Sequence, residues 1–225
     1  MLASFATIAA SYAVGTVPIP YLIGRATKGI DLRNVGSGNV GASNVWQSVS
    51  RWLVVPVGLA QIAQGVAAVL IAKSAGQSSG VQMQAGVAVL VASDWNPWLR
   101  FAGGRGVGQT IGVLLVLAPW ALGAFAIVSL IGVVLRAIPQ CVALGLVATP
   151  IAAAISGEPA SVVAGCAALA TIAMTKRLLG NGAPDPGCDR TGVWLIRLLY
   201  DRDIRDREAW VRRGLSEHSG ASATK

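Results

Sequence analysis

The sequence has few charged residues, a single histidine and only three cysteines. Charged side chains make up 12% of its 225 residues, whereas soluble domains carry about 25%. The histidine, His218, lies near the carboxyl end, and no CxxC pair occurs. These absences disfavour a disulfide framework, a zinc centre and a Ser-His-Asp hydrolase. We expect Cys141 and Cys166 to be packing residues and Cys188 to lie in a carboxyl-terminal tail.

Apolar residues, by contrast, are abundant. They make up 54% of the chain, and the mean hydropathy is +0.61. Long apolar runs without strict alternation predict an all-α polytopic membrane protein rather than a barrel. The net charge of +8 fits basic residues gathered on one side of a membrane, and no nucleic-acid-binding motif accompanies it. We expect membrane lipids as partners, no nucleic acid, and a monomer.

The apolar runs predict about seven short transmembrane helices. We expect them at about 2–23, 52–72, 81–95, two within 107–135 divided at Pro119, 141–155 and 159–175. Pro18 and Pro20 should kink the end of the first helix. Several runs are shorter than the roughly 20 residues that an average bilayer needs. A five-span topology with re-entrant segments is the alternative.

Basic residues set the predicted orientation. An outside amino terminus places seven loop cations inside and only Lys73 outside, which is a positive-inside pattern. The seven are Arg25, Lys28, Arg33, Arg51, Arg100, Arg105 and Arg136. The carboxyl terminus is then cytoplasmic too. We expect the inner membrane of a bacterium, with both glycine-rich loops on its cytoplasmic face.

The first of these loops has an unusual composition for so apolar a chain. It runs Gly36-Ser37-Gly38-Asn39-Val40-Gly41-Ala42-Ser43-Asn44. Glycines let a ligand approach the backbone, and successive N–H groups with serine and asparagine side chains form anion-binding concavities. The loop therefore predicts a phosphate or carboxylate cradle. A flexible connection between helices is the alternative.

A second cluster, Gly103-Gly104-Arg105-Gly106, brings a fixed cation. Guanidinium presents a planar fork to phosphate oxygens, so we regard Arg33, Arg100 and Arg105 as candidate phosphate partners. The alternative for each is a lipid-headgroup arginine, and Asp31 should pair with a neighbouring cation. An anionic head with an apolar tail, as in phospholipid precursors, suits such a site.

The carboxyl-terminal part differs in composition from the rest. Apolar residues recur at helical spacing over about 192–215, which predicts an amphipathic helix on the inner leaflet or, alternatively, on the protein itself. Residues 216–225 look disordered. We therefore expect a transmembrane unit over 1–182 and a cytoplasmic tail over 183–225.

Three segments resemble the signatures of the bacterial acyl-phosphate:glycerol-3-phosphate acyltransferase family, PlsY. Lys28 to Asn44 is similar to the pattern K-G-x-D-x-R-x-x-G-S-G-N-x-G-A-T-N. Phe101 to Thr110 is similar to F-x-G-G-K-G-V-A-T, and Arg177 to Gly180 to the end of H-x-x-N-x-x-R-L-x-G. The resemblance covers roughly residues 10–182.

This resemblance implies seven spans and acyl transfer from acyl phosphate to the 1-hydroxyl of glycerol 3-phosphate, giving lysophosphatidic acid and phosphate for phospholipid synthesis. It implies no metal and no other cofactor. Arg105 would be the catalytic cation. The substrate-binding residues would be Arg33, Ser37, Gly38, Asn39, Gly41, Ser43, Asn44, Gly103, Gly104 and Gly106.

The chain departs from the family patterns at several polar positions. Arg105 replaces lysine, and Ser93-Asp94 replaces glycine-histidine. Neutral or different side chains stand at Gln47, Gln61, Gln64, Thr171 and Met174, where the patterns have arginine, aspartate, lysine, histidine and asparagine. A divergent acyltransferase is the leading hypothesis. A non-catalytic relative that binds lipid precursors and a small-solute transporter are the alternatives.

Overall fold

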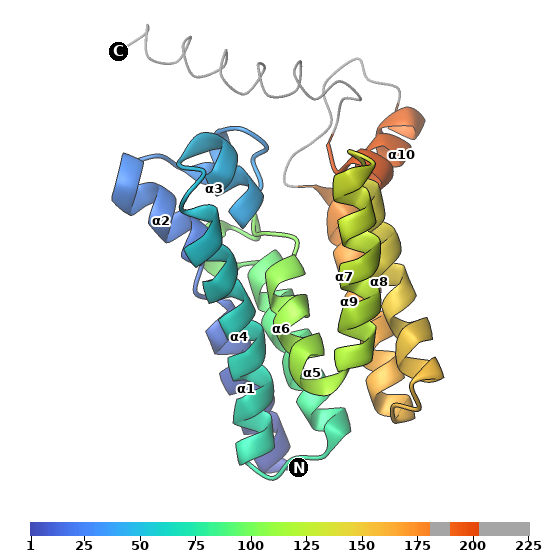
Figure 1. Cartoon of the computed structure of the whole chain (residues 1–225). Helices are drawn as coiled ribbons and strands as arrows, with labels where there is room; N and C mark the ends of the chain where they lie inside the picture. Colours follow the sequence, from blue (N-terminus) through green and yellow to red (C-terminus); the bar gives the residue numbers. More distant parts are fainter. Residues whose placement is uncertain (181–189, 203–225) are drawn as a thin grey trace, which may run out of the picture.

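The computed structural model describes residues 1–180 and 190–202, and this part of the chain is helical (Figure 1). The long helices and their connecting helices follow one another without a strand among the described residues. They are α1 (Leu2–Gly15), α2 (Ile19–Lys28), α3 (Ala42–Ser48), α4 (Val54–Ser74), α5 (Ser79–Asp94), α6 (Val107–Leu117), α7 (Pro119–Val134), α8 (Ile138–Ile155), α9 (Ala160–Leu179) and α10 (Arg190–Tyr200), with 3₁₀ turns at Leu32–Asn34 and Pro97–Leu99.

The long helices form two packed groups. In one, α4 lies against α1, α5 and α6, and in the other α7, α8 and α9 pack together (Figure 1). Contacts of α9 with α5 and α6 join the groups. The main core lies at this junction, where Leu90, Leu114 and Leu169 are among its buried side chains.

Small residues allow the closest helix crossing. At Gly65 of α4, an added Cβ would lie 2.1 Å from the Gln109 carbonyl oxygen, and at Gly112 of α6 it would lie 2.1 Å from that of Ile62. Backbones that approach this closely are typical of helix packing in lipid, where small residues replace the hydrophobic driving force. The glycine content therefore serves α4–α6 packing as well as the loops.

Within the described residues, four segments are long and apolar enough to cross a membrane, namely Leu2–Lys28, Val54–Ser74, Ile138–Ile155 and Ala160–Leu179. The helices α6 and α7 are apolar but shorter, with 11 and 16 residues. Many large apolar side chains face outward, including Leu59, Leu130 and Ile151. The all-helical prediction is confirmed, whereas the number of seven crossings stays a prediction.

The first span is broken near Pro18 and Pro20, where the sequence predicts a kink. α1 ends at Gly15 and α2 begins at Ile19, so carbonyl groups lose their helical partners at the break. The Gln64 amide donates to the carbonyl oxygens of Val14 and Val17, at 2.8 and 3.0 Å. Asn96 donates to that of Thr16 at 2.8 Å. Two buried side-chain amides thus donate hydrogen bonds to the carbonyl groups that the break leaves without helical partners.

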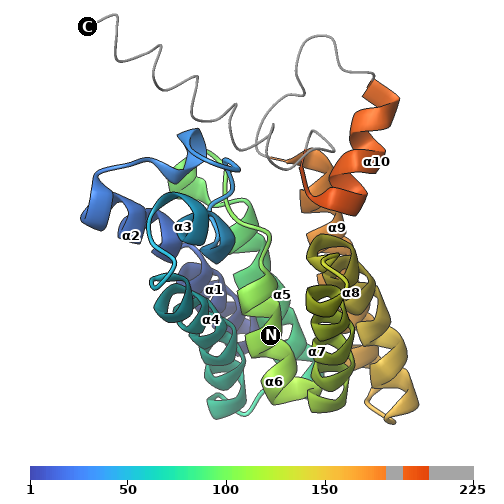
Figure 2. The same cartoon turned by 45° about the horizontal axis from the view of Figure 1, so that its top comes forward.

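The segments that carry the glycine clusters gather at one end of the bundle, here called the loop end. α2, α3 and α10 lie there (Figures 1 and 2), and the amino terminus lies at the opposite end (Figure 1). Trp52 and Trp98 at the loop end are 76% and 73% exposed, a position typical of aromatic residues at a membrane interface.

The loop predicted at about 25–51 contains more helix than expected. α2 continues to Lys28, and residues 42–48 form α3. Ser43 and Asn44 therefore lie in the first turn of a short helix rather than in a glycine loop. The predicted tail helix is described only over Arg190–Tyr200, and residues 203–225 lie outside the described residues, as do Cys188 and His218.

Candidate active site

The first glycine loop, residues 36–41, is shaped by two glycines in the left-handed region. Gly36 and Gly38 have φ of 56° and 64°. At Gly36 a Cβ would lie 2.4 Å from Asn44 Oδ1, so only glycine fits there. Asn39 is 6% exposed, and its Oδ1 has no hydrogen-bond partner within the described chain.

Asn44 organises this loop from inside. Its Nδ2 donates to the carbonyl oxygens of Leu32, Val35 and Asn39 at 2.9–3.0 Å, and its Oδ1 accepts from the Ser37 N–H at 3.3 Å. The side chain is fully buried. Since its amide is already bonded, Asn44 shapes the loop in this structure rather than offering donors to an anion.

The second glycine loop, residues 103–106, contacts the first directly. The Val40 N–H points to the Gly103 carbonyl oxygen at 3.5 Å, and a Cβ on Gly104 would lie 2.8 Å from the Val40 carbonyl oxygen. The Gly103 and Gly104 N–H groups donate to the carbonyl oxygens of Asp94 and Ser93 at 3.2 Å. The two loops therefore meet at one end of the bundle.

Arg33 links the segment before the first glycine loop to the 3₁₀ turn before the second. Its Nε and NH2 donate to the carboxylate of Asp31, at 3.0 and 2.6 Å, and its NH1 donates to the Leu99 carbonyl oxygen at 3.3 Å. This guanidinium lowers the pKa of the Asp31 carboxyl below its ordinary value. The predicted cation partner of Asp31 is confirmed, and a phosphate at Arg33 would compete with that carboxylate. Arg100 is exposed.

Arg105 makes an ion pair that the sequence did not predict. Its Nε contacts Asp201 Oδ1, and Arg177 Nε lies 3.5 Å from the same oxygen. Arg105 is half-buried between the loops and α10, whereas Arg177 is 5% exposed. Asp201 had no signal in the sequence, because nothing in the local pattern shows that α10 returns to the glycine loops.

Two buried charged side chains lie beneath the second glycine loop. Asp94 is fully buried, and neither carboxylate oxygen has a hydrogen-bond partner in the described part of the chain. Lys176 is 3% exposed and donates to the Phe101 carbonyl oxygen at 3.1 Å. Lys176 and Arg105 act electrostatically on Asp94. Sequence reasoning missed Lys176, because a cation at the end of an apolar run also fits the positive-inside pattern.

One glutamine that departs from the family patterns, Gln64, belongs to a neutral hydrogen-bonded network with Gln109 and Ser93. Gln109 Nε2 donates to Gln64 Oε1 and to Ser93 Oγ, both at 3.0 Å. Gln61 is buried nearby. A Cβ added to Gly108 of α6 would lie 2.7 Å from the Cβ of Gln61. Gln47 is exposed on α3. The loss of charge at Gln64 is therefore matched by satisfied amide hydrogen bonds.

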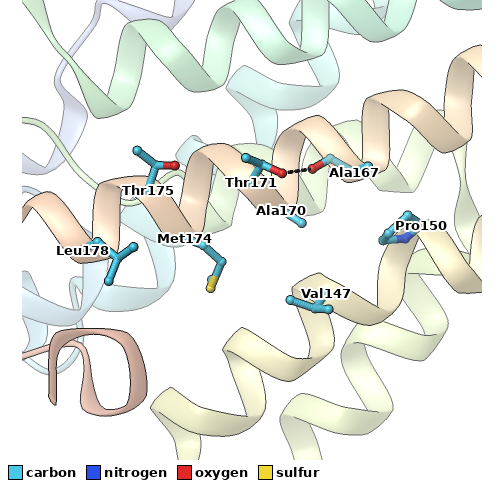
Figure 3. A pocket seen from close by; sticks show the side chains of 8 residues that line it. All are labelled: Val147, Pro150, Ala167, Ala170, Thr171, Met174, Thr175 and Leu178. Carbon is cyan, nitrogen blue, oxygen red and sulfur yellow. Dashed lines mark hydrogen bonds between the residues drawn. The ribbon is translucent and has the colours of Figure 1, made fainter. Parts of the chain in front are cut away.

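Thr171 and Met174 line an apolar pocket between α8 and α9 (Figure 3). The pocket has a volume of about 330 Å³ and is open at one side. Its lining residues are Val147, Pro150, Ala167, Ala170, Thr171, Met174, Thr175 and Leu178. The Thr171 hydroxyl donates to the Ala167 carbonyl oxygen at 2.8 Å. The lining includes Leu178, the residue that follows Arg177 in α9.

No group of three or more histidine, cysteine, aspartate or glutamate side chains is arranged to hold a metal ion among residues 1–180 and 190–202. Cys141 and Cys166 are buried and unbridged, as expected for packing residues. The site is thus built from backbone amides, neutral side chains, basic residues and the carboxylates of Asp94 and Asp201.

Known proteins share this architecture. A crystal structure of PlsY, an integral membrane glycerol 3-phosphate acyltransferase, in its glycerol 3-phosphate form superimposes with a TM-score of 0.74 at 25% identity, over 90% of this chain and 95% of that one. A lysophosphatidic acid form of PlsY gives 0.72 at 23% identity and supports the fold. The chain is a multi-pass membrane protein with this helical fold.

The sequence comparisons identify the family to which the chain belongs. Residues 5–180 match the family model described as glycerol-3-phosphate acyltransferase. Glycerol-3-phosphate acyltransferase 4 of Dehalococcoides mccartyi strain CBDB1 is 35% identical over 225 residues, 94% of each chain. A relative from Desulforudis audaxviator is 41% identical over 127 residues, 56% of this chain and 64% of that one. The chain belongs to the glycerol-3-phosphate acyltransferase family, which confirms the resemblance of its signatures.

Proposed function

We propose that this protein transfers a fatty acyl group from acyl phosphate to the 1-hydroxyl of glycerol 3-phosphate and so takes part in phospholipid synthesis. The observation that carries the proposal is the direct contact of the two glycine loops, at Val40 and Gly103, beside Arg105. Family membership supplies the reaction class, and the loop contact supplies a place for two anions.

The reaction requires little direct chemical participation by protein side chains. The acceptor hydroxyl oxygen attacks the acyl carbonyl carbon, an ester C–O bond forms, the C–O bond to phosphate breaks, and the hydroxyl proton leaves with the phosphate. An acyl phosphate is already activated, so positioning and charge stabilisation supply most of the catalysis. Arg105 would offset the negative charge that develops on the departing phosphate.

The other site residues divide into donors and supports. We assign the backbone amides and side chains of the glycine loops, together with Ser43 in the first turn of α3, to anion binding. These are Ser37, Gly38, Asn39, Gly41, Ser43, Gly103, Gly104 and Gly106. The unbonded Oδ1 of Asn39 suits a substrate hydroxyl donor. Asn44 would act by shaping the first loop, and Arg33 by linking the segments that precede the two loops, because their side-chain hydrogen bonds are made within the protein.

We also propose the membrane arrangement of this site. The loop end faces the cytoplasm of a bacterial cell, with the amino terminus outside, because the loop cations gather there. The transmembrane unit ends near residue 182, and the protein acts as a monomer without a cofactor. The α8–α9 pocket holds part of the acyl chain, because it is apolar, open at one side and lined by Leu178, which follows Arg177 in α9.

Purified protein in detergent, with palmitoyl phosphate and radiolabelled glycerol 3-phosphate, tests the activity. We expect labelled lysophosphatidic acid, and we expect Arg105→Ala to lower the rate about 10- to 100-fold, because one charge-assisted contact is lost. Arg105→Lys should retain more activity than Arg105→Ala, since it keeps the cation. Product formation that is unaffected by Arg105→Ala would assign the charge stabilisation to another residue.

A non-catalytic role in binding lipid precursors is the second candidate. Two observations favour it, namely the pairing of Arg105 with Asp201 and the neutral glutamine network at Gln64 and Gln109. Complementation of a bacterial strain that lacks this acyltransferase separates the two candidates. Growth rescue supports the enzyme, whereas an expressed protein that fails to rescue supports the binder.

A further inference from the structure

The carboxylate of Asp201 lies between two arginines of different elements. Arg105 from the second glycine loop and Arg177 from α9 both direct Nε toward Asp201 Oδ1. The Asp201 side chain is 25% exposed, and those of the arginines are 14% and 6% exposed. An oxyanion held by two guanidinium groups in a partly desolvated place is the arrangement that also suits a phosphate.

The helix that brings Asp201 to this place is held by reciprocal capping. Arg197 of α10 donates to the carbonyl oxygens of Leu178 and Leu179, at 3.2 and 2.9 Å. Arg177 of α9 donates in return to the Leu198 carbonyl oxygen at 3.1 Å. The last carbonyl groups of a helix lack partners within that helix, so each arginine satisfies the end of the other helix.

The backbone at Asp201 suits this role. Asp201 directly follows α10 and has a φ of 57°, a left-handed conformation that aspartate and asparagine adopt more readily than other non-glycine residues. Its N–H donates to the Arg197 carbonyl oxygen at 3.0 Å. The end of α10 therefore orients the carboxylate toward Arg105 and Arg177.

We propose that Arg105 and Arg177 form a binding site for the phosphate of the acyl donor, and that Asp201 of the same chain occupies this site until the substrate displaces it. The identity of the ligand rests on the proposed function, whereas the competition between Asp201 and a phosphate does not. Arg177 NH2 also donates to the Pro139 carbonyl oxygen at 2.7 Å, so Arg177 stays anchored to α8 when Asp201 leaves.

The position of the apolar pocket indicates that the phosphate bound by Arg105 and Arg177 belongs to the acyl donor rather than to glycerol 3-phosphate. Leu178 lines the pocket between α8 and α9 and follows Arg177 in the same helix (Figure 3). A phosphate at Arg177 would place an attached acyl chain next to this pocket. Glycerol 3-phosphate has no chain to fill it, so the glycine loops remain for the acceptor.

Binding of inorganic phosphate to the purified full-length protein in detergent tests the competition without turnover. Asp201→Asn keeps the size of the side chain and tolerates the left-handed backbone, but it removes the competing charge. We expect the calorimetric Kd for phosphate to fall about three- to tenfold, because an occupied site weakens apparent affinity by the fraction that is free. Glu158→Gln, in the α8–α9 turn, removes the same charge elsewhere and should leave the Kd unchanged.

Two further variants test the mechanism. Arg197→Gln removes the cap that holds α10 and should tighten phosphate binding in the same direction as Asp201→Asn. Arg177→Gln in the Asp201→Asn background should weaken phosphate binding again. In turnover assays, Asp201→Asn should lower the KM for palmitoyl phosphate without lowering kcat. A lower kcat with an unchanged KM would instead show that Asp201 positions Arg105 for catalysis, and an unchanged phosphate Kd in both Asp201→Asn and Arg197→Gln would overturn the proposal.

The two proposals fail separately in these measurements. If the wild-type protein makes no lysophosphatidic acid but Asp201→Asn still tightens phosphate binding, only the proposed function fails. If the wild-type protein is active and Asp201→Asn leaves the phosphate Kd unchanged, only the proposed competition between Asp201 and phosphate is refuted.

Discussion

At the scale of single residues, the absence of a side chain at Gly106 allows the second glycine loop to reach the site. Gly106 has a φ of 59°, and a Cβ there would lie 1.6 Å from Leu90 Cδ1 and 3.0 Å from Asp94 Oδ1. The backbone conformation and the packing both exclude a larger residue. Gly106 is the residue directly before α6, and its backbone conformation orients the neighbouring Arg105.

Gly106→Ala should therefore destabilise the protein by about 2–4 kcal/mol, through steric overlap and a strained backbone. We expect a lower thermal unfolding temperature in detergent and loss of acyltransferase activity. Gly58→Ala is the matched control, since no atom lies within 4 Å of the added Cβ in α4, and alanine favours helix by up to about 1 kcal/mol. Equal unfolding temperatures for the two variants would contradict this account.

Asp31 offers a second prediction at this scale. Its ion pair with Arg33 is half-exposed, so Asp31→Asn should cost about 1 kcal/mol or less. Because pairing lowers the pKa of Asp31 in the folded protein below the ordinary 3.8, its stabilisation is complete well above 3.8 and is lost as pH falls through the lower folded value. The difference in unfolding temperature between wild type and Asp31→Asn should therefore shrink as pH falls from about 6 to below 3.8. A difference that grows at low pH would refute the assignment.

At the scale of elements, α9 carries both the polar and the apolar halves of the proposed donor site. Arg177 of that site is buried at its loop end, and Ala167, Thr171 and Met174 line the pocket earlier in the helix. The sequence showed that Thr171 and Met174 depart from the family pattern. Only the packing of α8 against α9 shows that the two side chains line an apolar space.

Filling this space should change chain-length preference. Thr171→Phe should raise the KM for palmitoyl phosphate by about five- to tenfold, because a pocket contact of this size is worth 1–3 kcal/mol. The KM for a short donor such as butyryl phosphate should change much less. Ile151→Phe, on an exposed face of α8, is the control and should affect neither donor. Equal effects of Thr171→Phe on both donors would place the chain elsewhere.

The break between α1 and α2 shows what local sequence patterns can and cannot predict. Proline positions predicted a kink here, because proline lacks an N–H and fixes φ, and the structure shows a full break between two helices. The partners of the freed carbonyl groups, Gln64 and Asn96, lie 47 or more positions away in sequence. A local pattern cannot reveal such partners, so the reason for Gln64 became visible only in the tertiary structure.

At the scale of the whole molecule, the topology brings four distant segments to the loop end. Residues 36–41, residues 103–106, the end of α9 and the end of α10 meet around Arg105. The exposed apolar faces of the helices lie toward the surrounding lipid, and Trp52 and Trp98 are exposed at the same end. This placement fits a site that receives a soluble phosphate ester and a lipid-like donor at an interface.

The sequence by itself determined the class of this protein and predicted the two glycine-rich segments. Apolar runs require helices in lipid, because backbone groups find no partners in hydrocarbon, and the glycine signatures specify loops with positive φ and close approach. The tertiary structure decided which charges meet. The pairing of Arg105 with Asp201, the burial of Asp94 and Lys176, and the reciprocal caps of α9 and α10 depend on how helices distant in sequence pack, and local periodicity carries no record of that packing.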